Sequence, residues 1–288
     1  MTKILVLGST GMLGHVVERY FTNQEYDVYS TTRNKNNDLY FDAEKDIKSL
    51  EKIIKLVKPD VVINCVGILN KDADENKAVA VQINSYLPHY IDDLSKYYNF
   101  KFVHISTDCV FDGKKGNYSE DSEKDAKSFY GQSKALGEIN NDHSITLRTS
   151  IIGPDTSEKG IGLFKWFMDQ EGEVNGFSEV IWTGVTTIEL AKQIEVAINN
   201  NLTGLYHVVN GDKIDKYSLL QLFKTHFQKE IIINKNDQYK SDKSLVATRT
   251  DFKFDIPSYD IMIKEMNNWV VKNNDLYEEK IGKSRCKQ

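Results

Sequence analysis

Cysteine and proline are scarce in this chain, and both shortages exclude classes of protein. The 288 residues contain only 4 Pro and 3 Cys. The sequence has neither an internal repeat nor a low-complexity linker. Cys65, Cys109 and Cys286 form an odd set without metal-type spacing, so we expect reduced thiols and no disulfide framework. This cysteine usage fits a cytoplasmic protein.

Other shortages exclude further classes. No run of about 18 apolar residues occurs, so no membrane span is expected. The opening residues, MTKILVLGST, hold too few apolar residues before a glycine turn to form a signal-peptide core. The formal net charge is −5 and no basic stripe is present, which disfavours nucleic-acid binding. The six histidines show no ligand spacing, so no metal site is predicted.

The first half of the chain alternates strand and helix patterns. The composition, 40% hydrophobic and 27% charged, is that of a soluble globular protein. The strand patterns are apolar on both faces, as in a parallel sheet covered by helices on both sides. We therefore predict a Rossmann-type, doubly wound parallel sheet of the α/β class. Strands are predicted at 3–8, 26–31, 60–67, 101–106 and 144–150, and helices at 12–21, 47–57, 78–98 and 128–139.

The pattern loosens after residue 150. We expect a cofactor-binding domain over 1–150 and a smaller mixed α/β substrate lobe over 151–288, partly interleaved with the first domain. The lobe should lie on the carboxyl edge of the sheet. Its predicted elements are helices at 161–169, 187–199, 217–227 and 258–271 and strands at 205–210 and 230–234.

A glycine-rich turn, GSTGMLG at residues 8–14, follows the first predicted strand. Gly8 permits the tight turn, Gly11 lets the backbone approach a pyrophosphate, and Gly14 lets the helix pack on the strand. Free N–H groups at the start of the next helix can bind phosphates. A glycine triplet alone is weak evidence, but the strand–turn–helix context favours dinucleotide binding by Gly8, Thr10, Gly11, Met12, Leu13 and Gly14.

The ends of the next two strands indicate how the cofactor is recognised. Arg33 stands where an acidic residue would bind a ribose 2′-hydroxyl; an Arg can pair with a 2′-phosphate, which favours NADPH over NADH. Asp42 either meets the adenine amino group or is the N-cap of the next helix. The small residues Cys65, Val66 and Gly67 leave room for the cofactor backbone.

A Thr, a Tyr and a Lys form a candidate proton-transfer site. Tyr130 and Lys134 are four residues apart and share one face of a predicted helix. A nearby ammonium lowers the pKa of a phenol, which would let Tyr130 donate a proton to a carbonyl oxygen. Thr107 ends the fourth strand and can hydrogen-bond the same oxygen. Asn84, on the helix beside this site, either contacts the cofactor or is a buried structural hydrogen bonder.

In these motifs the chain resembles the extended short-chain dehydrogenase/reductases, within the branch of dTDP-4-dehydrorhamnose reductases. The resemblance implies NAD(P)H-dependent reduction of a 4-keto group on a nucleotide-linked 6-deoxy sugar. It assigns Thr107, Tyr130 and Lys134 to the catalytic triad, with Tyr130 and Lys134 also touching the cofactor. Arg148 and Ser150 would line the substrate cleft with Asp108, Cys109 and Val110. The matching stretches are GSTGMLG, NCVG, INSYLP, STDCVFDG, YSED, YGQSKALGE, LRTS and GLYHVVNG.

Two departures from the family pattern reshape the expected sugar pocket. Cys109 stands where the rhamnose enzymes usually carry Tyr, and Ile151 stands where they usually carry an aromatic residue. Loss of two rings makes room for an N-acetyl substituent. The combination is similar to capsule and O-antigen reductases acting on UDP-2-acetamido-2,6-dideoxy-hexos-4-uloses, with a UDP-N-acetyl-L-rhamnosamine-type product. The partner is thus expected to be a UDP- or dTDP-linked 4-keto-6-deoxy sugar.

The substrate lobe offers weaker candidates. Trp166 or Trp182 stacks on the uracil or flanks the sugar, with core packing as the alternative. Arg249 is a candidate for the diphosphate, with a surface position as the alternative. The family sometimes holds magnesium at a homodimer contact through acidic residues. Here His15 stands where a carboxylate is wanted, so a homodimer is retained as an expectation and the metal is not.

Three competing functions remain from the sequence. The chain could be an ordinary dTDP-4-dehydrorhamnose reductase. Dehydratases of the superfamily carry Glu where this chain has Cys109, and epimerases hold NAD tightly, whereas Arg33 favours exchangeable NADPH. The regulatory subunit of methionine adenosyltransferase resembles the same reductases and binds NADP without reductase turnover. The retained triad favours an enzyme over such a regulatory module.

Overall fold

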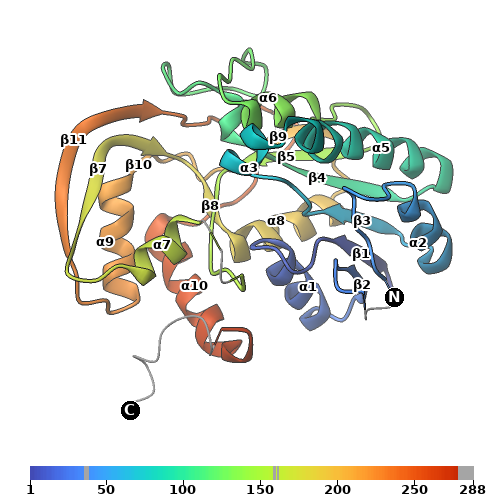
Figure 1. Cartoon of the computed structure of the whole chain (residues 1–288), viewed down its shortest axis with the longest axis horizontal. Helices are drawn as coiled ribbons and strands as arrows, with labels where there is room; N and C mark the ends of the chain where they lie inside the picture. Colours follow the sequence, from blue (N-terminus) through green and yellow to red (C-terminus); the bar gives the residue numbers. More distant parts are fainter. Residues whose placement is uncertain (36–38, 158–159, 161, 278–288) are drawn as a thin grey trace.

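The centre of the structure is a parallel sheet. The computed structural model describes residues 1–35, 39–157, 160 and 162–277. Within them, six strands pair in the order β2-β1-β3-β4-β5-β9, and each pair is parallel. Helices cover both sides of this sheet (Figure 1), so the predicted doubly wound α/β fold is confirmed. The strands are β1 (Lys3–Leu7), β2 (Asp27–Thr31), β3 (Val61–Asn64), β4 (Lys101–Thr107), β5 (Ile145–Thr149) and β9 (Gly204–His207).

Alternating side chains of β1 bury both faces of the sheet. Ile4 and Val6 join the cluster that contains helices α1 and α8, whereas Leu5 and Leu7 join the cluster beneath α2 and α5. A strand that is apolar on both faces can pack helices on each, as the sequence pattern predicts. These helices are α1 (Gly14–Asn23), α2 (Ser49–Val57), α5 (Leu87–Tyr98) and α8 (Thr187–Asn199).

The C-terminal residues build a lobe and also complete the central sheet. Strand β9 pairs with β5, and α8 packs on α1, so two elements beyond residue 150 lie in the layers of the first domain. A second sheet, in the order β10-β7-β11, projects from the lobe with α9 beside it (Figure 1). The lobe elements are α7 (Leu163–Asp169), β7 (Glu173–Trp182), β10 (Ile214–Asp215), α9 (Lys216–His226), β11 (Ile232–Asp242), α10 (Tyr259–Lys272) and η3 (Asn274–Leu276).

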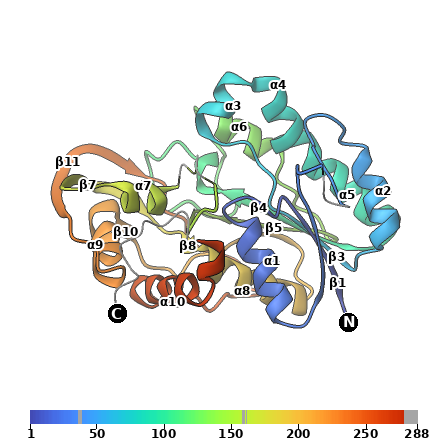
Figure 2. The ribbon, with the colours of Figure 1, turned by 60° about the horizontal axis from the view of Figure 1, so that its bottom comes forward.

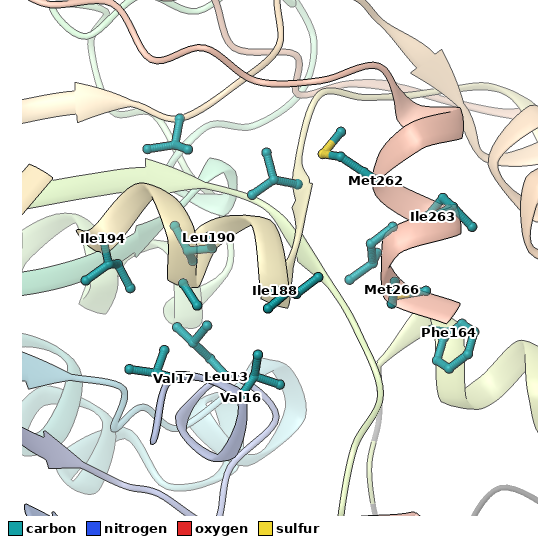
Figure 3. Packing of buried hydrophobic residues seen from close by; sticks show 14 of the residues in the cluster. Leu13, Val16, Val17, Phe164, Ile188, Leu190, Ile194, Met262, Ile263 and Met266 are labelled. Atoms are coloured by element: carbon teal, nitrogen blue, oxygen red, sulfur yellow. The ribbon is translucent and has the colours of Figure 1, made fainter. Parts of the chain in front are cut away.

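One continuous core joins the lobe to the sheet. Figure 3 shows Val16 and Val17 of α1 facing Leu190 of α8, with Met262 and Met266 of α10 nearby. Because burial of apolar surface is the main stabilising term, this shared cluster ties the lobe to the α1 and α8 side. The apolar core therefore crosses the domain boundary expected at residue 150, and that boundary stays a prediction from the sequence.

Several elements differ from the sequence prediction. The expected helix at 78–98 is divided into α4 (Lys77–Ala80), a π-helical turn η1 (Val81–Tyr86) and α5. Strand β7 was not predicted, and β11 runs well beyond the predicted residues 230–234.

No helix of the described residues combines the length and apolar character that crossing a membrane requires. The remaining elements are α3 (Asn70–Glu75), η2 (Asp108–Val110), α6 (Phe129–Leu136), β6 (Ile151–Ile152) and β8 (Val185–Thr186).

Candidate active site

The glycine turn after β1 is shaped by close backbone contacts. Gly8 has a φ of +80°, and a Cβ added at Gly14 would lie 2.1 Å from the Gly8 carbonyl oxygen. At Gly11, by contrast, the nearest atom to an added Cβ is 3.5 Å away. The protein itself therefore leaves space above Gly11, where a ligand backbone can approach.

Helix α1 begins with an open N-terminus. No side chain caps it, and its first turn has no acidic residue. The N–H groups of His15, Val16 and Val17 bond the carbonyl oxygens of Gly11 and Leu13. What the helix start offers a phosphate is therefore its positive dipole end. Of the six predicted turn residues, Gly11, Met12 and Leu13 line the adjoining cleft, while Gly8 and Gly14 shape the turn and Thr10 is exposed.

A cleft of about 360 Å³ opens at the carboxyl ends of β1, β3, β4 and β5. This is the edge where doubly wound sheets bind their ligands, because the strand order reverses there. The cleft brings most of the predicted residues of the first domain together. It is lined by Gly11, Met12, Leu13, Asn64, Cys65, Val66, Gly67, Leu69, Asn70, Ile105, Ser106, Thr107, Asp108, Cys109, Tyr130, Lys134, Thr149, Ser150, Ile151, Asp155, Gly162 and Leu163.

Thr107, Tyr130 and Lys134 meet in this cleft. Thr107 ends β4, and its hydroxyl accepts a hydrogen bond from the Cys109 N–H at 3.2 Å and hydrogen-bonds the Tyr130 phenol. Tyr130 and Lys134 lie on α6, whose start is capped by the Ser128 side chain. A Cβ at Gly131 would lie 2.1 Å from the Cys109 carbonyl oxygen, so glycine lets α6 approach η2 closely. In Figure 2, α3 and α4 lie beside α6.

The sequence predicts that Lys134 lowers the pKa of the Tyr130 phenol, but in the structure this pKa is raised. Burial raises the pKa of its phenol, the charge of Cys109 acts in the same direction, and only the Thr107 hydrogen bond notably opposes them. Lys134 is not among the groups that lower this pKa, and its ammonium donates to the Ile105 carbonyl oxygen at 2.7 Å. Tyr130 is therefore a protonated phenol at neutral pH.

Both cleft cysteines are weak acids. Burial raises the pKa of Cys65 to about 12 and that of Cys109 to about 11. A thiol with a raised pKa is not a proton donor matched to neutral pH. This property of Cys109 argues against the dehydratase alternative.

Arg33 and Asp42, the two residues expected to contact the adenosine end of the cofactor, differ in whether their charged groups are already paired. Arg33 is exposed after β2 and faces the Asp42 carboxyl. Asp42 is not the N-cap of α2, because that helix begins at Ser49 and its N-cap is Lys48. Its carboxylate instead accepts from the Glu44 N–H at 3.2 Å and pairs with Lys45 at 3.1 Å. Burial acts to raise the pKa of Asp42, but these partners lower it overall.

Asn84 is a structural hydrogen bonder rather than a cleft residue. Its side-chain amide accepts from the Ile68 N–H at 3.0 Å and donates to the Ile68 carbonyl at 2.9 Å and to Ser133 Oγ at 3.0 Å. It lies within η1, where the π-helical turn directs it toward the loop after β3. Asn84 thus holds the loop after β3 against α6, as in the structural alternative, and its contact with the cofactor stays a prediction.

On the substrate side, Asp108, Cys109 and Ser150 line the cleft, whereas Val110 and Arg148 do not. Val110 is fully buried in a small apolar cluster. Arg148 is fully buried and forms a two-pronged ion pair with Glu138, at 2.7 Å from Nε and 2.6 Å from Nη2. Its guanidinium is bound to Glu138 and does not reach the cleft lining. The prediction that Arg148 contacts the substrate is therefore corrected.

The three lobe candidates also lie outside the cleft lining. Trp166 is 40% exposed on α7, and Trp182 is a core residue at 3% exposure. Arg249 pairs with Asp251 and stacks on the Tyr206 ring, with its guanidinium 4.1 Å from the ring centroid. It also bonds the Leu205 carbonyl near the amino end of β9, opposite the cleft edge. The diphosphate assignment for Arg249 is therefore corrected.

The sequence did not single out Lys216 and Lys243, two lysines of the lobe that do not line the cleft. Lys216 and Lys243 are both close enough to act on the Asp108 carboxyl electrostatically. No local signal marks them, because only the packing of the lobe brings them to η2. Among the described residues, no group of three or more His, Cys, Asp or Glu side chains is placed to hold a metal ion.

Comparison with known proteins finds a matching family model and several similar proteins. The family model described as RmlD substrate binding domain matches residues 1–244. The chain is 30% identical over 216 residues to the spore coat polysaccharide biosynthesis protein SpsK of Bacillus subtilis, covering 73% of this chain and 74% of SpsK. It is 30% identical over 139 residues to methionine adenosyltransferase 2 subunit beta of Danio rerio, covering 47% of this chain and less than half, 42%, of that protein.

A solved structure shares the fold. The crystal structure of dTDP-4-dehydrorhamnose reductase from Bacillus anthracis in complex with NADP superposes with a TM-score of 0.79 and 20% identity. The match covers 92% of this chain and 99% of that chain. At this identity the likeness concerns the arrangement of the elements, which includes both the sheet and the lobe.

Proposed function

Because the chain belongs to the family of the RmlD substrate binding domain, we propose that it is a sugar-nucleotide reductase. It uses NADPH to reduce the C4 keto group of a nucleotide-linked 6-deoxy-hexos-4-ulose. The observation that carries the proposal is the meeting of Thr107, Tyr130 and Lys134 in the cleft that adjoins the glycine turn. A hydrogen-bonding hydroxyl, a protonated phenol and an ammonium are the groups that a carbonyl reduction needs.

The residues present fit a dinucleotide cofactor. The uncapped α1 and the open space above Gly11 suit a pyrophosphate, and Cys65, Val66 and Gly67 line the adjoining wall. Arg33 is exposed and available to a 2′-phosphate, which supports NADPH, with NADH as the alternative. When bound, the reduced nicotinamide supplies the hydride to C4.

The protein groups supply the proton and the orientation. Thr107 hydrogen-bonds the phenol and holds the keto oxygen beside it. As the hydride reaches C4, the oxygen gains negative charge and Tyr130 transfers its proton to it, giving the alcohol. Lys134, at the same cleft wall, presents a positive charge to the cofactor.

We propose a UDP-2-acetamido-2,6-dideoxy-L-hexos-4-ulose as the substrate, with a product of the UDP-N-acetyl-L-rhamnosamine type. Cys109 and Ile151 both line the cleft, and each is smaller than the aromatic residue expected there in rhamnose enzymes. Their size leaves space for an acetamido group beside the reacting carbon. The dTDP-linked rhamnose precursor is the alternative substrate.

The substrate proposal is tested by comparing the two nucleotide sugars directly. With NADPH in excess, loss of its absorbance should give a kcat/KM about tenfold or more higher for the UDP-acetamido substrate. NMR of the product identifies the new C4 configuration. A clear preference for the dTDP-linked precursor contradicts the sugar assignment. NADPH binding without turnover of either sugar, as in a regulatory module, contradicts the enzymatic proposal.

The pH dependence of activity should report Lys134. Burial lowers the pKa of its ammonium to about 8, and the charges of Glu138 and Cys65 only partly oppose this. The ammonium is present below that pH and lost above it, so kcat/KM should fall as the pH rises through about 8. The pKa of Lys216 is also lowered to about 8, so the same decline must persist in Lys216→Met. A rate that stays constant well above this range contradicts the role of Lys134.

A further inference from the structure

We propose that His15 and Tyr277 are positioning residues for the cofactor, because together they tie the glycine turn to the C-terminal lobe. This inference rests on the proposed function and adds to it that a distant part of the chain sets the affinity of the turn for a dinucleotide. His15 lies in the first turn of α1, and Tyr277 follows η3, 262 residues later. The chain that follows α10 lies against α1 (Figure 2).

Three side chains form a directed relay of hydrogen bonds from the lobe to the turn. Trp269 Nε1–H, which can only donate, bonds the Tyr277 hydroxyl at 3.1 Å. That hydroxyl lies 2.8 Å from His15 Nε2, and His15 Nδ1 lies 2.8 Å from the Gly11 carbonyl oxygen. A carbonyl oxygen can only accept, so Nδ1 carries the proton. In the neutral ring Nε2 is then the acceptor, and the Tyr277 O–H donates to it.

The relay fixes the direction of one peptide of the turn. The Gly11 carbonyl oxygen accepts from the backbone N–H of His15 at 3.2 Å as well as from its ring. The C=O and N–H of a trans peptide point in opposite directions, so a carbonyl held toward His15 turns the Met12 N–H away from it. Because Met12 lines the cleft, this N–H becomes a donor that a pyrophosphate can use.

The turn gains from this support because glycine is costly to order. An added Cβ at Gly11 would meet only the Gly8 carbonyl oxygen, at 3.5 Å, so sterics within the turn restrict its peptide little. Ordering a flexible loop when a ligand arrives costs conformational entropy, and a loop already held in its bound form binds more tightly. The bond from the buried His15 ring holds the turn before a cofactor arrives.

The lobe end of the relay is itself held at two points. Tyr277 is 2% exposed, and its ring packs edge-on against the His15 ring with the centroids 5.6 Å apart. Arg19, one turn further along α1, pairs with Asp275 of η3 at 2.8 Å. A ring contact and an ion pair thus dock the end of the lobe on α1, and the Tyr277 hydroxyl connects this docked segment to His15.

The His15 ring tests the relay in the cofactor-free protein. NMR of the histidine ring nitrogens in the full chain, near neutral pH, should show the His15 proton on Nδ1 and Nε2 as an acceptor. Tyr277→Phe removes the donor to Nε2 and should shift the resonance of that nitrogen. Tyr259→Phe removes a different buried hydroxyl of the lobe and should leave the resonance in place. A His15 ring without a proton on Nδ1 overturns the relay.

Cofactor affinity tests the positioning role. Calorimetry of the full chain with NADP should show affinity about 10- to 30-fold lower in His15→Leu and about five- to tenfold lower in Tyr277→Phe. His15→Asn keeps an amide N–H near the position of Nδ1 and should bind within about threefold of wild type. The matched control is Tyr259→Phe, whose lost hydroxyl bonds the Asp212 carbonyl at 2.7 Å, and it should bind NADP within about twofold of wild type.

The outcomes separate this inference from the proposed function. If the sugar is reduced, His15→Leu should raise KM for NADPH about tenfold while kcat changes by less than about threefold, because His15 does not touch the reacting atoms. Reduction with NADP affinity within about twofold of wild type in His15→Leu or Tyr277→Phe overturns the positioning role and leaves the reductase standing. An equal loss of affinity in Tyr259→Phe also overturns it. NADP binding that depends on His15 and Tyr277 in a chain that reduces no 4-keto sugar supports the inference and refutes the reductase.

Discussion

Tyr130→Phe should lower kcat for 4-keto sugar reduction by about 100- to 10,000-fold, the range for loss of a positioned proton donor. Burial raises the pKa of the Tyr130 phenol, so the wild-type residue is protonated across the neutral range. Phe keeps the ring and its packing but has no proton for the oxygen at C4. The measurement is steady-state loss of NADPH absorbance with saturating nucleotide sugar.

A matched substitution separates chemistry from structure. Tyr97→Phe removes a phenol hydroxyl from a side chain that is 79% exposed on α5 and should leave kcat unchanged. NADPH affinity should stay within about twofold in both variants, because neither change removes a cofactor contact made by charge. Turnover that survives Tyr130→Phe means that another group supplies the proton, and the mechanism proposed for this cleft is wrong.

Arg148→Met should lower the free energy of unfolding by up to about 3–5 kcal/mol, the usual cost of breaking a buried ion pair, because among the described residues Glu138 keeps only Lys124, at 3.2 Å, as an ion-pair partner. Both side chains of the Arg148–Glu138 pair are 1% exposed. Burial acts to raise the pKa of Glu138, but Arg148, Ser106 and Lys124 lower it overall. Urea denaturation followed by circular dichroism measures the loss.

A double variant is the control for this pair. Arg148→Met with Glu138→Gln removes both buried charges and should recover part of the lost stability. Because the Glu138 pKa is depressed in the fold, its contribution is present above the unfolded pKa and is lost as the pH falls through the folded value. The difference between wild type and Arg148→Met should therefore shrink in acid. A single variant as stable as wild type at neutral pH contradicts this account.

The same pair bears on the active site. Glu138 Oε1 accepts a hydrogen bond from Ser106 Oγ at 2.6 Å, and Ser106 directly precedes Thr107. Arg148 also contacts the buried His207 of β9 through a 2.8 Å hydrogen bond. The family resemblance placed Arg148 in the cleft. In the structure its side chain leaves β5 toward Glu138 and His207 instead. This role depends on the neighbouring strand and helix, which local sequence does not reveal.

Local patterns in the sequence were enough to predict the parallel sheet and the residues that meet at its carboxyl edge. Apolar alternation marks strands such as β1, and the spacing of glycines 8, 11 and 14 follows from contacts within one short turn. Tyr130 and Lys134 share a face because a helix brings residues four apart together. The carboxyl ends of parallel strands meet at one edge, so Thr107 could be placed beside them from topology alone.

The lobe was predicted less well because its contacts join residues far apart in the chain. Strand β11 is mostly exposed and polar, and its form depends on backbone pairing with β7. Trp182 and Arg249 were chosen by residue type, but one is enclosed by the core and the other is paired at the far end of β9. Lys216 had no sequence signal at all.

Residue type and local spacing therefore predict which candidate reacting groups meet, since a turn, a strand end and one helical face place them. Which partner each charged group meets depended on the packed chain. The Arg148 guanidinium is paired with a carboxylate and supports the fold, whereas the Lys216 ammonium lies over an indole ring. Long-range packing alone distinguishes these two outcomes, because each cation's partner comes from a distant part of the sequence.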